Sequence, residues 1–235
     1  MNLQRAKLFL VVSDINIVDI YNHLRVSDYN GSEYGFLNLS LLTGNRIHGT
    51  YVEKEDYSED RFDPFGNYIE TINFVNFKHI KFHIEHINEK KFLLVIYDPP
   101  RALKNFFDNL FELLQRKVGF RYVEFNLKKI IDDLEKQHGL MILDVGRIRV
   151  SGVIVDNVSK ASIEISSVSN AFKSLSQLVE GQRYTIDKIV ASLLVDDDVT
   201  NFEMSKTGTI KVDENRFNFI LKAVSSSLLN RDGWN

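Results

Sequence analysis

The chain is dominated by short runs of β-branched and aromatic residues that are joined by tight turns. Residues 6–13, with the apolar run Leu8–Val12, and the continuous apolar run 92–97 are of the kind found in buried strands. Residues 34–42 and 46–53 flank the turn Thr43-Gly44-Asn45, which is typical of a hairpin. Strands that come in hairpins, with helices between groups of them, predict an α+β fold of antiparallel or mixed sheets.

Five segments combine helical spacing of apolar residues with a capping residue at the start, so we expect about five helices packed on the sheets. The strongest pattern follows Asp98-Pro99-Pro100, where an apolar stripe extends from Leu103 to Val118 and Gly119 occupies the position of a C-terminal cap. The other four helices are expected after Asp14, Asn126, Ser169 and Asn215.

The segment 68–87 fits two different periods. Ile80, Phe82 and Ile84 alternate with polar residues as in a strand, whereas Phe77, Ile80 and Ile84 also have helical spacing. The content of Phe, Ile and Val favours a strand, and a helix is the alternative.

Residues 54–67 are acidic and end in the turn sequence Asp63-Pro64-Phe65-Gly66, which predicts a long surface loop. We interpret residues 1–140 as an N-terminal α+β unit that contains this acidic loop. Residues 141–235 are interpreted as a C-terminal α+β unit, with one continuous domain as the alternative.

The composition restricts the cellular compartment and the kinds of reaction that the protein could carry out. None of the 235 residues is cysteine, which excludes disulfides, thiolate nucleophiles and cysteine-bound zinc. The first apolar run is too short for a secretory signal, and no run reaches the ~18 apolar residues of a membrane span. The sequence therefore predicts a cytoplasmic protein without membrane contact. Its net charge is −3, yet residues 78–149 hold 14 Lys and Arg against 10 Asp and Glu.

The segment Gly146–Gly152 is the most distinctive basic feature. On a strand, Arg147, Arg149 and Ser151 share one face while Ile148 and Val150 face the core. Two neighbouring guanidinium groups suit phosphate or carboxylate partners. The alternative is an exposed strand face whose arginines meet acidic neighbours. Together with a stacking tyrosine, the candidate nucleic-acid or anion-binding residues are Arg147, Arg149, Lys128, Lys129, Arg121 and Tyr122.

A metal site is the competing interpretation for the histidine-rich segment. On a strand only His83 and Glu85 are near neighbours, while a helix would place His79, His83 and His86 on one face. The Asp/Glu-x-Lys pattern of one nuclease class occurs only at Glu89-Lys90-Lys91, in an expected turn. The favoured interpretation has no metal and no cofactor, because nucleotide-binding and hydrolase motifs are also absent.

The leading hypothesis is a non-catalytic binding or interaction module that self-associates or binds a protein partner. It would contact nucleic acid as an accessory component of a multi-protein system, for example in antiviral defence. The hypothesis depends on the lack of any complete catalytic set in the sequence. The alternatives are a metal-dependent hydrolase or nuclease that uses His83 and Glu85, and a purely structural homo-oligomer.

Overall fold

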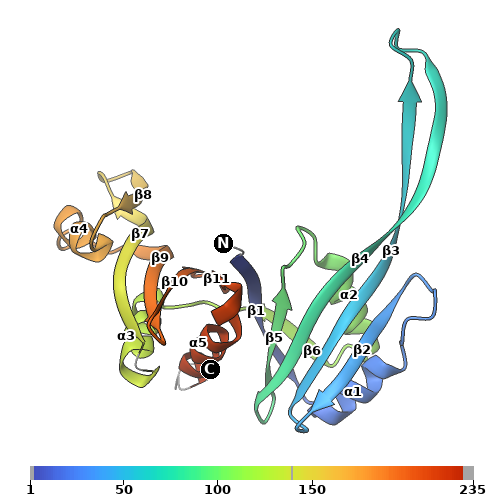
Figure 1. Cartoon of the computed structure of the whole chain (residues 1–235), viewed down its shortest axis with the longest axis horizontal. Helices are drawn as coiled ribbons and strands as arrows, with labels where there is room; N and C mark the ends of the chain where they lie inside the picture. Colours follow the sequence, from blue (N-terminus) through green and yellow to red (C-terminus); the bar gives the residue numbers. More distant parts are fainter. Residues whose placement is uncertain (1–2, 139, 230–235) are drawn as a thin grey trace. The chain divides into compact units, whose positions relative to one another are not determined.

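The computed structural model describes residues 3–138 and 140–229 (Figure 1). These residues form mostly antiparallel sheet, with eleven strands and five α-helices. The α+β class is confirmed at that level. In the described part of the chain, no helix is both long enough and apolar enough to cross a membrane.

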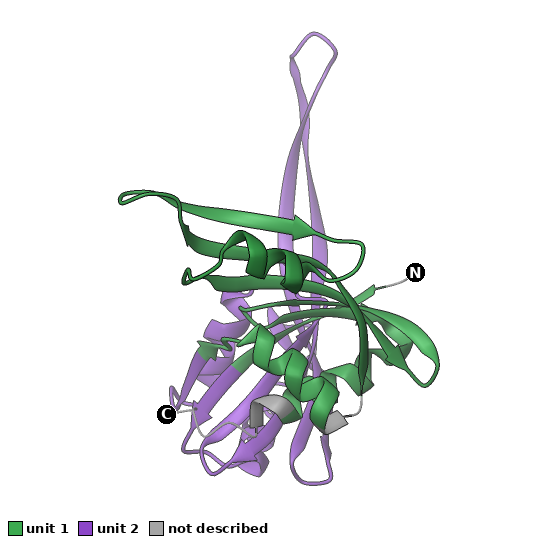
Figure 2. Ribbon diagram, turned by 90° about the vertical axis from the view of Figure 1, so that its left-hand side faces the viewer, with its two compact units in different colours: residues 1–9, 121–235 green, residues 10–120 purple. Residues whose placement is uncertain are grey.

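Internal contacts divide the chain into two compact units (Figure 2). Unit 1 comprises residues 1–9 and 121–235, and unit 2 comprises residues 10–120. This division differs from the one at residue 140 that the sequence suggested. In unit 1, the start of β1 (Leu3–Ser13) pairs antiparallel with β11 (Thr209–Asp213). A pairing between the two ends of a chain leaves no trace in local periodicity.

Unit 2 contains a sheet with the strand order β2-β3-β4-β5. Helices α1 (Ile17–Arg25) and α2 (Lys104–Leu113) accompany it. Sheet residues Tyr51 and Phe82 make ring contacts with Phe106 of α2 at 5.2 and 5.6 Å between centroids. The strands are β2 (Tyr34–Leu42), β3 (Arg46–Phe62), β4 (Tyr68–Asn88) and β5 (Lys91–Tyr97), and β6 (Val118–Tyr122) begins at the end of this unit.

The long β3–β4 hairpin decides two sequence predictions. The ambiguous segment is a single 21-residue strand, so the strand interpretation of residues 68–87 is confirmed. The loop expected over 54–67 is wrong for residues 54–62, which continue β3 and pair with β4 as far as Phe62. The acidic side chains there are exposed, apart from that of the half-buried Glu55, so their charge does not conflict with strand geometry. Only 63–67 remain outside the two strands.

Several expected helix ends lie elsewhere in the structure. Helix α4 (Ala171–Leu178) is capped by Asn170 rather than by Ser169, and α2 begins at Lys104 rather than directly after Asp98-Pro99-Pro100. Helix α1 is capped by Asn16, whose side chain accepts a hydrogen bond from the Asp19 backbone N–H, rather than by Asp14. Helix α2 ends at Leu113 because Gln115 and Arg116 adopt positive φ angles of 55° and 61°. Positive φ values cannot continue a right-handed helix, so the expected extension to residue 118 does not form.

Unit 1 contains the strand order β1-β11-β10-β9-β7-β8. Its helix α3 (Leu127–His138) is capped by Asn126, whose side chain accepts a hydrogen bond from the Lys129 backbone N–H, as predicted. The other strands are β7 (Met141–Ile154), β8 (Lys160–Ser166), β9 (Thr185–Val195) and β10 (Asp198–Ser205). The other helices are α4 (Ala171–Leu178), the 3₁₀ turn η1 (Glu214–Arg216) and α5 (Phe217–Leu229).

Candidate nucleic-acid interface

The sheet of unit 1 has two faces of opposite character. On β7, Ile148 and Val150 are fully buried, whereas Arg147 and Arg149, which alternate with them, are exposed. The same alternation recurs on the neighbouring strands, because successive side chains of a strand point to opposite faces. The apolar residues therefore form a core on one side, and the polar residues form a continuous surface on the other.

Six cationic side chains share this polar surface, which we call the basic face. Arg149 lies directly opposite Lys188 of β9, and Lys211 of β11 lies directly opposite Arg5 of β1. Residues opposite each other in antiparallel strands share a face, so each pair presents two cations together. The six residues of the basic face are Arg5, Lys7, Arg147, Arg149, Lys188 and Lys211.

Carboxylates interrupt the basic face without neutralising it. Glu203 of β10 lies 2.9 Å from Lys188 Nζ and 3.1 Å from Lys211 Nζ. Partial burial alone would raise the pKa of Glu203, but the hydrogen bonds from both lysines outweigh it and lower that pKa. Glu164 accepts a looser contact from Arg147 Nε at 3.6 Å. Asp144 and Asp213 are the other two carboxylates of this surface, and they lie near strand ends. The six cations therefore outnumber the four carboxylates.

An exposed aromatic ring marks one end of the basic face. Tyr122 is 68% exposed, and its ring centroid lies 5.5 Å from that of Phe9. The Lys7 Nζ lies 5.0 Å from the Tyr122 centroid, which is a cation–π arrangement. Tyr122 thus combines an exposed ring with a neighbouring cation, the pairing that single-stranded nucleic-acid sites use for base stacking and phosphate contact.

The structure brings together only some of the residues predicted from sequence. Lys128 and Lys129 are exposed on α3, whose buried residues Leu127 and Ile130 flank them. This helix contacts β7 and β9 through its apolar side, so the two lysines are not part of the basic face. Lys128 instead lines a hollow of about 480 Å³. Arg121 is exposed next to Tyr122.

Four cations of the basic face were missed by sequence reasoning. Arg5, Lys7, Lys188 and Lys211 each stand on strands that look unremarkable by themselves. No local cluster marks them, since they meet only through the strand order and the register. Strand alternation indicated the exposed face of each strand, but not which strands are neighbours.

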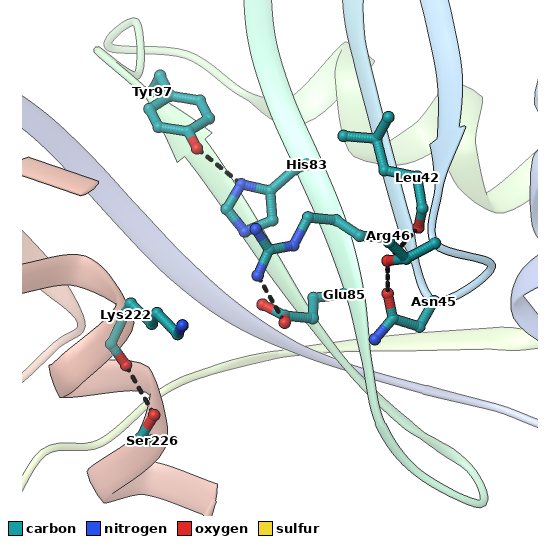
Figure 3. Close-up of polar contacts among 9 residues, drawn as sticks. Leu42, Asn45, Arg46, His83, Glu85, Tyr97, Lys222 and Ser226 are labelled. Carbon is teal, nitrogen blue, oxygen red and sulfur yellow. Dashed lines mark hydrogen bonds and ion pairs between the residues drawn. The ribbon is translucent and has the colours of Figure 1, made fainter. Parts of the chain in front are cut away.

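The histidine candidate is a buried, internally bonded group in unit 2 (Figure 3). His83 is 3% exposed, and its Nδ1 is 2.8 Å from the Tyr97 hydroxyl. The rings of His83 and His48 stack at 5.2 Å. Burial, together with the charge of Arg46 and with His48, lowers the pKa of His83 to about 3. His83 is therefore neutral near physiological pH.

The residues of the metal-site interpretation already have protein partners. Glu85 binds Arg46 with 2.6 Å between Oε1 and Nη2, and Tyr97 engages one ring nitrogen of His83. Residues 3–138 and 140–229 contain no group of three or more His, Asp or Glu side chains that could hold a metal ion. The ligand set required for metal-dependent hydrolysis is thus not assembled around His83 and Glu85.

Comparisons with known proteins leave the function open. No family model and no curated protein matches the chain. Among solved structures, it is similar to DynU16, a protein of the dynemicin biosynthetic locus, with 9% sequence identity and 95% of each chain covered. The TM-score of 0.22 is too low for this likeness to inform either fold or function.

Proposed function

We propose that the protein is a non-catalytic binding module whose basic face contacts nucleic acid. The observation that carries the proposal is the alignment of cations on neighbouring strands of one exposed sheet face. A row of guanidinium and ammonium groups provides the charge-assisted hydrogen bonds that phosphates accept. This arrangement does not require a cofactor or a catalytic group.

The exposed ring of Tyr122 favours a single-stranded ligand. An unpaired base can stack on it while the backbone follows the cations across the sheet. From β1 to β7 the path crosses four strand spacings, which is roughly 19 Å at ~4.8 Å each. A sheet surface of that width holds a short stretch of single strand, whereas a duplex buries its bases away from Tyr122.

Fluorescence anisotropy with labelled single-stranded and duplex DNA and RNA, at several salt concentrations, tests the proposal. We expect tighter binding to single strands and a linear fall of log affinity with log salt. Arg147→Ala with Arg149→Ala should weaken binding roughly tenfold, about 1.4 kcal/mol. It should also reduce the salt slope by about 1.4, because two phosphate contacts are lost at about 0.7 each.

Lys128→Ala with Lys129→Ala is the matched control, since it removes the same charge from α3 and leaves the basic face intact. Binding by this variant should stay close to that of the unmodified chain. Equal losses in both double variants would mean that net charge, rather than the basic face, governs binding. An absence of binding to every probe at low salt would end the nucleic-acid proposal.

A further inference from the structure

The outer part of the β3–β4 hairpin is a two-stranded ribbon, residues 55–76, which we call the arm. Strand β2 pairs with β3 only between Arg46 and Glu53, and β5 pairs with β4 only between Phe82 and Asn88. Beyond those points, no other described strand pairs with the hairpin. Figures 1 and 2 show the arm extending away from the rest of unit 2. An isolated two-stranded ribbon is at best marginally stable in water, so a further strand paired with the arm would stabilise it.

The arm also exposes more apolar surface than a solvated ribbon needs. Some of its rings contact each other, as Tyr57 and Phe74 do at 5.5 Å, yet they stay exposed. Exposed apolar groups gathered in one place mark interaction sites. The large apolar residues of the arm are between 39% and 89% exposed, and they are Tyr57, Phe62, Phe65, Tyr68, Ile69, Ile72, Phe74 and Val75.

Charge is divided unequally between the two strands of the arm. The β3 side carries four carboxylates, whereas the β4 side carries only Glu70, which lies 3.3 Å from Arg61 Nη1. Proteins commonly protect an open sheet edge with charged side chains, because charge discourages pairing with another strand. The β3 edge has this protection and the β4 edge does not. The four β3 carboxylates are those of Glu55, Asp56, Glu59 and Asp60.

We propose that β4 of the arm pairs antiparallel with β4 of a second copy of the chain. The resulting four-stranded ribbon has the order β3-β4-β4-β3, with apolar strands inside and acidic strands outside. Central strands are commonly apolar and edge strands are commonly charged. This pairing therefore accounts for both the apolar β4 strand and the acidic β3 strand of the arm. Pairing with an unrelated protein would not require β4 to be complementary to itself. The sequence of β4 is complementary to itself, which favours a second copy of the chain as the partner.

Self-complementarity places the two-fold axis at Asn73. In that register Ile72 faces Phe74 of the second copy, and Thr71 faces Val75. Ile69 faces Phe77 in the same way. Apolar and β-branched residues are therefore opposite one another, which is the favourable cross-strand pairing. The exposed aromatic and aliphatic side chains of the arm gain neighbours on both faces.

The same register keeps the negative charges apart. Glu70 lies opposite Asn76 of the second copy, and the two Glu70 residues are offset by six residues, or about 20 Å. The two acidic β3 strands are three strand spacings apart, about 14 Å. That separation exceeds the Debye length of ~8 Å at physiological ionic strength, so repulsion between them is largely screened.

A single introduced thiol tests both the pairing and its register, because the chain has no cysteine of its own. Residues paired with themselves at the axis have Cα atoms about 4.5–5.5 Å apart, which lies within the range of a disulfide. Under mild oxidation, Asn73→Cys should give a covalent dimer on a denaturing gel. Ser58→Cys on β3 and Glu70→Cys away from the axis should form no covalent dimer and should run as monomers on the same denaturing gel. Equal cross-linking of all three variants would overturn the proposed register.

Light scattering of the unmodified chain over a concentration series should show a dimer, and a monomer at every concentration would overturn the proposal. Ile72→Glu with Phe74→Glu puts like charges opposite each other and should abolish the dimer. Ile72→Lys with Phe74→Glu pairs opposite charges and should retain it. Ser58→Glu with Phe62→Glu adds the same charge to β3, so this control should also stay dimeric. A dimeric double-glutamate variant would overturn the pairing.

Discussion

The two halves of the β3–β4 hairpin are built from the same two strands but have different surroundings. At its base, Phe82 is 1% exposed and contacts Phe36 and Phe106. In the arm, Phe74 is 47% exposed and has Tyr57 as its ring neighbour. Strand formation is thus shared by both halves, whereas burial is not. The base is part of the core of unit 2, and the arm leaves similar residues exposed.

The largest expected effect is on the free energy of unfolding when Phe82 is truncated. Phe82→Ala removes a buried ring and leaves a cavity, which costs about 3–5 kcal/mol. Phe74→Ala in the arm removes a half-exposed ring and should cost less than about 1 kcal/mol. Urea denaturation at one low protein concentration, where the arm is unpaired, measures both values. Similar losses would mean that the arm is part of the folded core.

The second comparison concerns how stability depends on pH, because His83 is buried at the base of the hairpin whereas His79 is exposed. The pKa of His83 is about 3 in the folded protein, below the usual 6.5 of the unfolded chain. The unfolded chain therefore binds the extra proton between these two values. The resulting stability is present above pH 6.5 and is lost as pH falls toward 3, by at most about 1.4 kcal/mol per pH unit.

Urea denaturation between pH 7 and pH 4.5 checks this prediction. His83→Gln should flatten the decline of stability at acid pH, whereas His79→Gln, which replaces an exposed histidine, should leave the decline unchanged. His48 also has a lowered pKa, mainly because of burial, and adds a contribution of the same sign. A decline that is identical in all three proteins would show that His83 is not the group responsible.

Sequence patterns predicted most of the elements but not what surrounds them. Alternation located the strand at 68–87 and the exposed side of Arg147 and Arg149, because strand geometry is local. Neither the pairing of β1 with β11 nor the row of cations on the basic face could be predicted, because both depend on strand order. The acidic stretch at 54–62 suggested a loop, since charge and turn residues usually indicate one, yet an extended ribbon tolerates exposed charge on both faces.

The smallest of the three expected effects on stability comes from removing a carboxylate, either at the base of the hairpin or in the arm. Glu53 is 8% exposed at the base, where the Asn105 side-chain amide donates to it and Lys78 Nζ lies 3.7 Å away. Glu53→Ala removes the hydrogen bond from Asn105 and one of the two ion-pair partners of Lys78, and it should cost about 1–3 kcal/mol in urea denaturation. Glu59→Ala in the arm removes an exposed charge and should change stability by less than about 0.5 kcal/mol. If Glu53→Ala were equally neutral, water at Asn105 and the remaining ion pair of Lys78 with Glu55 would be enough to replace the carboxylate, and Glu53 would contribute no more to stability than an exposed carboxylate of the arm.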